Sequence, residues 1–254
     1  MKSERHQAIL DLLKRNHTVT VADIARELSV SSMTVRRDLS DLAADGLVVR
    51  VHGGAQLPHN ARGTTLSRVH SHEEKRHQFV AQKRAAAMLA AQHVKPGDSI
   101  FLGGGSTLEL MCEFLPTEGI RVITNSAPVF SLLADNTDVE LFLIGGTYRS
   151  NTRVFTMPSN NSGFFGLTAR KAFVSATGIF GNEVFGSYIN AATVLADALN
   201  RAHERYLVTD AHKVGRRDYY AFTTLDRMDA VFVNPDASEA DLDALRTWTH
   251  VISR

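Results

Sequence analysis

The sequence predicts an α/β protein with two parts, a winged helix-turn-helix domain at the N-terminus and a mostly parallel α/β domain after it. Three short segments between residues 4 and 44 place apolar residues at helical spacing, and an alternating segment with a glycine turn follows them. From residue 96 onward, short apolar segments typical of strands alternate with helical ones. Strands that alternate with crossover helices indicate a mostly parallel sheet covered on both faces.

The first two helices are expected over Glu4–Lys14 and Val21–Leu28. Both have apolar residues on one side and polar residues on the other, as helices that pack on a small core do. Thr20 stands three residues before Asp23, a spacing that resembles a capping box and marks the start of the second helix.

The third helix is the most informative element, because its outer face is unusual. Val35, Leu39 and Leu42 form one apolar stripe, and Ser31 or Ser32 is expected to cap the helix. The other sides carry hydroxyl groups and adjacent arginines, which suit phosphate oxygens and base edges. With one arginine of the following strand, the residues expected to contact DNA are Ser32, Met33, Thr34, Arg36, Arg37 and Arg50. On spacing alone, a three-helix domain that binds no DNA is an equally good interpretation.

A short hairpin is expected to complete the N-terminal domain. Gly46 stands where the C-terminus of a helix favours a left-handed residue. Leu47–Val51 alternates like a strand, and His52-Gly53-Gly54 turns the chain back. Three helices and a hairpin make a winged helix-turn-helix, in which the third helix enters the major groove. We place this domain at residues 1–57.

These residues resemble a known family. The runs Arg5-xxx-Ile9 and Ser31-xx-Thr34-Val35-Arg36-Arg37-Asp38-Leu39, together with His52-Gly53-Gly54-Ala55, look like the amino-terminal signature of DeoR-type bacterial transcription regulators. The signature is long and ordered, and it is more specific than a general helix-turn-helix pattern. The resemblance implies that the partner of the N-terminal domain is operator DNA.

Composition sets the frame for the whole chain. The 254 residues include 44% hydrophobic and 22% charged residues with a net charge of +1, which is ordinary for a globular protein. Residues 1–58 hold eight Lys/Arg and seven Asp/Glu, so any basic surface there is local. With one cysteine, Cys112, an internal disulfide is impossible, and a reducing compartment is expected. The start lacks a signal core and no apolar run reaches membrane-spanning length, so we expect a cytoplasmic protein without membrane contact.

A polar linker is expected between the two parts, over residues 58–76. This stretch lacks apolar periodicity, and the second domain is placed at 77–254, beginning with an alanine-rich helix at Gln78–Gln92. The linker contains His70, His72, Glu73 and Glu74. Their spacing is loose for a metal site and no distant partner is evident, so we expect no metal and interpret them as solvated linker residues.

The second domain should contain six strands and four helices after residue 96. The expected strands are Ser99–Leu102, Val122–Thr124, Glu140–Ile144, Ala172–Ser175, Arg205–Thr209 and Ala230–Val233. The expected helices are Thr107–Phe114, Pro128–Ala134, Ala191–His203 and Glu239–Trp248. In parallel sheets of this kind, ligands bind at the carboxyl ends of the strands.

Polar and glycine-rich loops follow several of these strands. The run Gly103-Gly104-Gly105-Ser106-Thr107 joins a strand to a helix and suits a phosphate monoester, because glycines allow close backbone approach and hydroxyls donate. It matches neither a dinucleotide fingerprint nor a Walker loop, so no cofactor is expected. A tight turn with an ordinary serine cap is the alternative. The loops after other strands add Asn125, Ser126, Gly145, Gly146, Asp210 and Lys213.

These loops resemble the carboxyl-terminal sensor domain of DeoR-type regulators, which looks like the ribose-5-phosphate isomerase fold. The resemblance implies an effector that is a phosphorylated sugar or a related metabolite. It assigns a phosphate cradle to Gly105, Ser106 and Thr107, with Gly104 beside it and Gly178 as a turn on the pocket side. The chain departs from the family pattern, which commonly has an acidic residue at Gly103 and a threonine at Leu108. The helix near Ala191–Leu199 also lacks the Glu and Lys usually seen there. The identity of the sugar therefore does not follow from the resemblance.

Two classes of function compete at this point. The first is a transcription regulator, expected to be a repressor of a carbohydrate-use operon that a sugar phosphate releases from DNA, and expected to be a homo-oligomer. The second is a sugar-phosphate isomerase-like enzyme with an accessory helix-turn-helix domain. Isomerisation needs a positioned acid and base, and Asp210 and Lys213 are the only charged pair that the sequence places near the loop. We therefore expect a regulator without catalytic residues.

Overall fold

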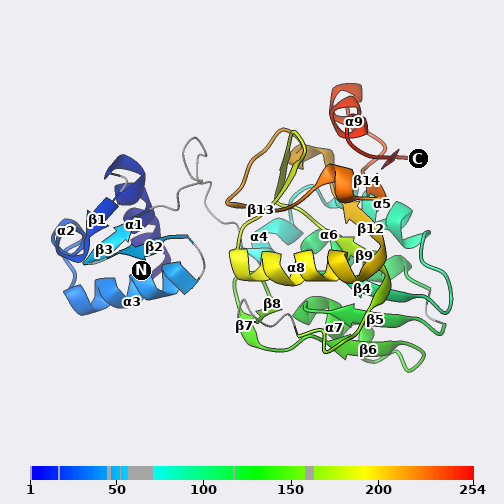
Figure 1. Cartoon of the computed structure of the whole chain (residues 1–254), viewed down its shortest axis with the longest axis horizontal. Coiled ribbons are helices and arrows are strands. Elements are labelled where there is room, and N and C mark those ends of the chain that lie inside the picture. Colours follow the sequence, from blue (N-terminus) through cyan, green and yellow to red (C-terminus); the bar gives the residue numbers. More distant parts are fainter. Residues whose placement is uncertain are drawn as a thin grey trace. The chain divides into compact units, whose positions relative to one another are not determined.

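The computed structural model describes residues 2–16, 18–44, 47–51, 53–56, 71–116, 118–157 and 163–254. The chain divides into two compact units, Met1–Arg68 and Val69–Arg254 (Figure 1). Each unit has its own buried apolar residues, as expected for domains that fold around separate cores.

The N-terminal unit is a winged helix-turn-helix, as the sequence predicts. Its helices are α1 (Lys2–Asn16), α2 (Val21–Glu27) and α3 (Ser32–Ala44). Its small antiparallel sheet has the order β1-β3-β2, with β1 at Thr18–Thr20, β2 at Val49–Val51 and β3 at Gly54–Gln56. The sequence analysis missed β1, which is only three residues long and precedes α2 directly. The side chains that close the core are Ile9, Leu13, Ile24, Val35 and Leu39.

Side-chain caps start the second and third helices of this unit. The Thr20 hydroxyl accepts a hydrogen bond from the backbone N–H of Asp23 at 3.1 Å and donates to the Asp23 carboxylate at 2.6 Å. Ser31, rather than Ser32, caps α3, because its hydroxyl accepts from the backbone N–H of Thr34 at 3.2 Å. The expected turn residues Gly46 and His52 lie outside the described residues.

The C-terminal unit is built on a seven-stranded sheet, and all neighbouring strands in it are parallel. The strand order is β15-β14-β12-β9-β4-β5-β6. The strands are β4 (Ser99–Leu102), β5 (Arg121–Thr124), β6 (Glu140–Leu143), β9 (Ala169–Val174), β12 (Ala202–Val208), β14 (Ala230–Phe232) and β15 (Val251–Ile252). All six predicted strands are present, and the short β15 was not predicted.

Two apolar layers cover the sheet, one on each face. Alternate residues of each strand belong to different clusters, as Phe101 and Leu102 of β4 do. The layer that includes Leu102 also contains residues of α5, α6 and α7. The layer that includes Phe101 contains residues of α8 and α9 (Figure 1). These helices span Val80–Ala91 (α5), Ser106–Met111 (α6), Ala127–Leu133 (α7), Ile189–Arg201 (α8) and Glu239–Arg246 (α9).

Two groups of short strands beside the main sheet were not predicted. A hairpin is formed by β7 (Thr147–Arg149) and β8 (Val154–Thr156). A second, antiparallel sheet has the order β10-β11-β13, with strands at Gly178–Phe180, Glu183–Gly186 and Tyr220–Thr224. Equally short strands of the main sheet were predicted because they alternate with helical segments, whereas most of these strands are not followed by an α-helix, and the alternation therefore does not reveal them.

The end of the expected linker needs correction. Residues 72–76 form a helix, α4 (His72–Arg76), rather than a solvated linker. Ser71 caps it, and a reciprocal bond joins the Glu74 carboxylate to the Ser71 backbone N–H at 2.8 Å. His72 is buried, and α4 packs on α6 of the C-terminal unit. The rest of the expected linker, residues 58–70, lies outside the described part of the chain.

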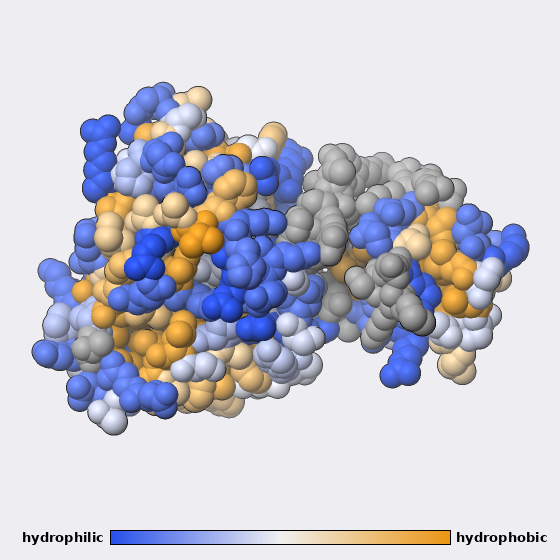
Figure 2. All heavy atoms as spheres, turned by 180° about the vertical axis from the view of Figure 1, so that it is seen from behind, coloured by the Kyte–Doolittle hydropathy of each residue, from blue (hydrophilic) through white to orange (hydrophobic). Residues whose placement is uncertain are grey.

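The face shown in Figure 2 carries interspersed polar and apolar side chains. Among the described residues, the most exposed large apolar side chains are Phe165 and Met33, in different units. Among the described residues, none of the helices has the length and apolar character needed to cross a membrane.

Candidate ligand cavities and nucleic-acid interface

A cavity rich in positive charge lies at the carboxyl ends of β4, β9 and β12. Its lining includes four cationic side chains, Lys75, Lys83, Lys213 and Arg216, and one carboxylate, Asp210. The glycine-rich loop and the residues after β9 complete the wall with Gly104, Gly105, Ser106, Thr107, Ser175, Ala176 and Thr177. The excess of positive charge makes this cavity suited to an anion.

Lys213 lies at the centre of the polar contacts in this cavity. Its Nζ lies 3.4 Å from the Asp210 carboxylate, 3.3 Å from the Ser175 hydroxyl and 3.5 Å from the Thr107 hydroxyl. Asp210 is almost fully buried, and it lies two residues after the end of β12. The sequence analysis placed Lys213, Asp210 and Thr107 at one sheet edge, and the structure brings the three together.

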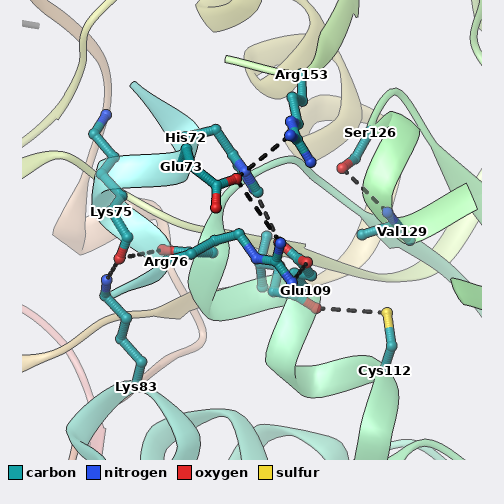
Figure 3. Close-up of polar contacts among 12 residues, drawn as sticks. His72, Glu73, Lys75, Arg76, Lys83, Glu109, Cys112, Ser126, Val129 and Arg153 are labelled. Atoms are coloured by element: carbon teal, nitrogen blue, oxygen red, sulfur yellow. Dashed lines mark hydrogen bonds and ion pairs between the residues drawn. The ribbon is translucent and has the colours of Figure 1, made fainter. Parts of the chain in front are cut away.

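Lys75 and Lys83 join the cavity from α4 and α5. Lys83 Nζ donates to the main-chain oxygen of Lys75, and the Ser106 hydroxyl donates weakly to the same oxygen at 3.4 Å (Figure 3). Burial, with a smaller contribution from nearby Lys213, lowers the pKa of Lys75 to about 8, while Asp218 opposes the shift. Burial also lowers the pKa of Lys83 to about 8. The lowered pKa values mean that nearby carboxylates and hydrogen bonds do not fully offset the cost of burying the positive charge of these lysines.

The glycine-rich loop has a conformation that explains its composition. Gly105 has φ +128°, a region that residues with a side chain rarely adopt. A Cβ at Gly104 would overlap Val154 of the β7–β8 hairpin. Both glycines therefore line the cavities with bare backbone, while Ser106 and Thr107 open α6.

A second cavity adjoins the first and shares Lys75, Gly104, Gly105, Ser175 and Thr177 with it. Its other lining residues are largely neutral. They are His72, Asn125, Thr152, Val154, Gly186, Ser187, Tyr188, Ala191 and Leu195. We refer to the first as the charged cavity and to the second as the neutral cavity.

Some residues expected at the ligand site do not line either cavity. Ser126 is buried and caps α7, accepting a hydrogen bond from the backbone N–H of Val129 at 3.4 Å. Gly145 and Gly146 lead into the β7–β8 hairpin. Gly178 begins β10, where a Cβ would meet the Arg216 main-chain oxygen at 2.6 Å. The structure thus places Ser126 at a helix cap, Gly145 and Gly146 in the loop before a hairpin, and Gly178 in a strand.

Several cavity residues were not predicted as site residues, and His72, Lys75 and Lys83 are among them. The signal for Lys83 was present, because Lys83, Ala86, Ala87 and Ala90 lie on one helical face and all four are buried. A lysine within an apolar stripe points to a buried charge. His72 and Lys75 lie in a polar stretch without such a pattern, and only the docking of α4 on α6 brings them to the cavities.

The predicted DNA-contacting face of α3 is exposed. Ser32, Met33, Arg36 and Arg37 are exposed, and 76% of the Met33 surface is accessible. Thr34 is half-buried, and its hydroxyl lies 2.9 Å from the Ser31 hydroxyl within the helix cap. The Thr34 hydroxyl thus has a structural contact in addition to any contact with DNA.

Arg50 of β2 reaches α3. Its guanidinium donates to the Ser40 hydroxyl at 2.9 Å and to the Arg36 main-chain oxygen at 3.4 Å. These bonds attach the wing strand to the helix that carries the exposed arginines. The side chain remains exposed.

Arg5 and Asp38 explain part of the sequence signature. Asp38 is almost fully buried, and the Arg5 guanidinium contacts both of its carboxylate oxygens, one of them at 3.0 Å. This bond holds the pKa of Asp38 below its usual value, with a smaller contribution from His6. The pair ties α1 to α3 and leaves the neighbouring Arg36 and Arg37 on the outside.

Comparison with known proteins gives the family. The DeoR-like helix-turn-helix domain matches residues 5–61, and the DeoR C-terminal sensor domain matches residues 78–234. The chain belongs to the DeoR family. It is a DNA-binding transcription regulator with a sensor domain, and the predicted resemblance is confirmed.

Full-length relatives support the same assignment. The lactose phosphotransferase system repressor of Streptococcus mutans is 36% identical over 99% of both chains. The protein of the same name from Lactococcus lactis subsp. lactis is 37% identical over 99% of this chain and 98% of the relative. The Staphylococcus aureus protein of that name is 32% identical over 99% of both.

The solved structures that resemble this chain are more distant. Ribose 5-phosphate isomerase A from Neisseria gonorrhoeae has 17% identity and a TM-score of 0.37, and it covers 53% of each chain. The β subunit of eIF2B from Chaetomium thermophilum has 15% identity and a TM-score of 0.42, covering 66% of this chain and 54% of that one.

Proposed function

We propose that this DeoR-family protein is a repressor of carbohydrate-use genes and that a phosphorylated sugar, bound in the charged cavity, releases it from operator DNA. The observation that carries the proposal is the excess charge at the carboxyl edge of the sheet. Lys75, Lys83, Lys213 and Arg216 face one cavity in which Asp210 is the lining carboxylate. The names of the full-length relatives support a repressor of sugar metabolism.

The phosphate group would lie between Lys213 and the loop that opens α6. Lys213 Nζ already lies within 3.5 Å of the Thr107 and Ser175 hydroxyls, so a phosphate there meets one cation and two donors. Lys75 and Lys83 supply further charge. Because α6 is only six residues long, these side chains rather than a helix dipole would provide most of the attraction.

Helix α4 offers a route from the cavity to the linker. It is the first described element after residues 57–70, and Lys75 on it lines both cavities. Lys75 also accepts bonds from Lys83 and Ser106 through its main-chain oxygen. A ligand that contacts Lys75 would therefore favour one position of α4. Release from DNA then requires that the ligand binds the DNA-incompetent state more tightly.

The DNA-binding half of the proposal rests on α3. We propose that Arg37 and Thr34 face base edges, and that Ser32, Arg36 and Arg50 face phosphates, with Met33 at the same surface. We also propose a homo-oligomer, because two recognition helices on two half-sites give the specificity that one helix lacks.

We propose that the cavity binds its ligand without turnover. Among the described residues that line the two cavities, Asp210 is the one carboxylate, and its oxygens lie 3.4 Å from Lys213 and 3.6 Å from His212. In this position the Asp210 carboxylate is suited to holding the Lys213 and His212 side chains in place. An assay for interconversion of aldose and ketose phosphates should show no activity above the uncatalysed rate.

A gel-shift titration tests the regulator directly. An operator is first selected from a random DNA pool with the full-length protein, and sugar monophosphates are then screened by thermal shift for ligands. A monophosphate that raises the melting temperature should also release the protein from that operator. A ligand that stabilises the protein and leaves the DNA complex intact would contradict the proposed control.

The roles of the two arginines can be separated on the same operator. Arg37→Ala should weaken binding by about 1–3 kcal/mol and relax the sequence preference, as loss of a base contact does. Arg36→Ala should weaken binding to all sequences and lower the salt dependence by about one unit of slope. If both variants keep the affinity and specificity of the wild type, α3 does not read DNA through this face.

A further inference from the structure

The two adjoining cavities have different chemistry. The charged cavity presents Lys83, Lys213 and Arg216, none of which lines the neutral cavity. Lys75 lines both cavities. A ligand that spans both therefore meets positive charge at one end and neutral groups at the other.

The neutral cavity combines hydroxyl and amide groups with a small apolar wall. Its hydroxyls include those of Thr152, Ser187 and Tyr188, and its apolar side chains include Val154 and Leu195. Two of the hydroxyls are fixed in place. Ser187 donates to the Asp218 carboxylate at 2.8 Å, and Tyr188 accepts from the Asn151 amide at 3.0 Å. Such a lining suits a hydroxylated carbon skeleton better than a second anion.

Asn125 contributes a buried acceptor to this wall. Only 1% of its surface is accessible, and its Nδ2 donates to the Phe155 main-chain oxygen at 3.1 Å. That bond fixes the orientation of the amide. Its Oδ1 is buried and has no hydrogen-bond partner among the described residues. A buried oxygen without a partner is costly, and a ligand hydroxyl that donates to it would remove the cost.

His72 contributes a second acceptor from the opposite element, α4. It is buried, and its Nε2 lies 2.9 Å from the Glu109 carboxylate, although not in the geometry of a hydrogen bond. Arg76 contacts the other Glu109 oxygen at 3.1 Å (Figure 3). The carboxylate favours the imidazole proton on Nε2, because the N–H then turns its partial positive charge toward the carboxylate oxygen, whereas a lone pair there would be repelled. Nδ1 is left as an acceptor, and it too has no partner among the described residues.

We propose that the neutral cavity is a hydroxyl-recognition subsite, in which His72 Nδ1 and Asn125 Oδ1 accept hydrogen bonds from hydroxyl groups of the ligand. The proposal rests on the proposed function, because the phosphate of the same ligand would occupy the charged cavity. The ligand class is a monophosphate of a sugar or polyol with free hydroxyls at the far end. A second phosphate or a carboxylate at that end meets two acceptors and is disfavoured.

Two substitutions separate recognition by His72 from its structural role. His72→Gln places an amide nitrogen near the position of Nε2, so it keeps a donor for Glu109 and removes the Nδ1 acceptor. His72→Asn places its amide near Nδ1, so it keeps an acceptor and loses the Glu109 contact. His93→Gln is the matched control, because His93 is a half-buried histidine that packs against Phe232 and lines neither cavity.

The experiment measures two dissociation constants for each full-length protein by calorimetry. One ligand is inorganic phosphate, and the other is the tightest binder in a panel of pentose, hexose and polyol monophosphates. The dissociation constant for inorganic phosphate divided by that for the monophosphate measures how much the hydroxylated part of the ligand adds to binding. We expect His72→Gln to reduce this ratio at least tenfold with the phosphate constant unchanged within twofold. His72→Asn should reduce this ratio less than His72→Gln does, and His93→Gln should have the same ratio as wild type.

Three outcomes would overturn the inference: a wild-type ratio near one, an unchanged ratio in His72→Gln, or a larger loss in His72→Asn than in His72→Gln. Asn125→Ser gives an independent check, since it should also lower the ratio while phosphate still binds. Failure of the proposed function would look different. In that case Lys213→Ala would leave the inorganic phosphate constant unchanged, whatever the His72 variants do.

Discussion

Buried lysines lie at both ends of the seven-stranded sheet, but the two ends compensate the charge differently. At the amino end, Lys171 Nζ lies 2.6 Å from the Asp98 carboxylate and donates to the His93 main-chain oxygen at 2.7 Å. At the carboxyl end, Lys75, Lys83 and Lys213 share a cavity with Asp210 as its one lining carboxylate.

The pKa shifts follow the same division. Burial alone would raise the pKa of Asp98, but the bonds from Lys171 and from the Lys95 backbone outweigh it and the pKa is lowered. At the other end, burial lowers the pKa of Lys75 and Lys83 to about 8. The amino end is therefore an internally satisfied ion pair, whereas the carboxyl end is arranged for an anion from outside.

The largest expected effect is on stability at the amino end. Lys171→Met leaves the buried Asp98 carboxylate without its main partner, which should cost about 3–5 kcal/mol of unfolding free energy. Lys83→Met at the carboxyl end removes a charge that the fold compensates poorly, so it should be neutral or stabilising. Urea unfolding of the two variants beside wild type checks the contrast. Equal losses of stability in both variants would remove the proposed difference between the two ends.

The second effect is on ligand response at the carboxyl end. Lys213→Ala should weaken phosphate or sugar-phosphate binding about 100-fold, because it removes the cation nearest Thr107 and Ser175. The variant should stay on the operator at ligand concentrations that release wild type. A gel-shift titration measures this. Release of Lys213→Ala at the wild-type concentration would show that the charge excess does not serve the ligand.

The third effect tests a neutral donor at the same place. Thr107→Val nearly preserves the shape of the buried Thr107 side chain and removes its hydroxyl. Ligand affinity should fall about tenfold, as expected for one lost hydrogen bond to a charged group. The melting temperature of the unliganded protein should change much less than its ligand affinity does. A Thr107→Ser variant, which keeps the hydroxyl, should retain most of the affinity and serves as the control.

The sequence predicted the parallel sheet because its strands are continuous apolar runs separated by helical periods. It also predicted that Thr107, Asp210 and Lys213 meet, since strand ends in a parallel sheet share one edge. It did not predict the partnership of His72 with Glu109, which are 37 positions apart in the sequence and carry no shared pattern. The DNA-contacting residues remain predictions, because exposure of Arg36 and Arg37 on α3 is necessary for that role but does not establish it.

The glycine loops show the same limit. Two glycines after β4 line the cavities, while Gly145 and Gly146 after β6 lead into a hairpin. The two motifs look alike in the sequence because both allow unusual backbone conformations. The two motifs differ in the residues that lie next to them in the folded structure. Gly104 lies directly against the Val154 side chain, whereas Gly146 approaches the main chain of Thr156 in the hairpin that it precedes.

The smallest expected effect is on pH dependence, and its sign follows from the lowered lysine pKa values. Between pH 8 and about 10.5 the unfolded chain holds protons on Lys75 and Lys83 that the folded chain has released. Stability from these two groups therefore rises with pH across this window and is unchanged below it. Tyr219, whose pKa burial raises to about 12, acts in the opposite direction at high pH. The measurable quantity is thus the difference between wild type and a Lys75→Met/Lys83→Met variant, which should lose the rise.

Ligand binding should show the opposite trend over the same range. A phosphate dianion favours the charged lysines and raises their pKa values, so binding at pH 8.5 should take up protons and affinity should fall severalfold between pH 7 and pH 9.5. Calorimetry in two buffers of different ionisation enthalpy measures the proton uptake. Lys171 lies at the amino end of the sheet, paired with Asp98, and lines neither cavity. Binding at pH 8.5 without proton uptake would mean that Lys75 and Lys83 do not contact the phosphate, and the anion would then depend on Lys213 and Arg216 alone.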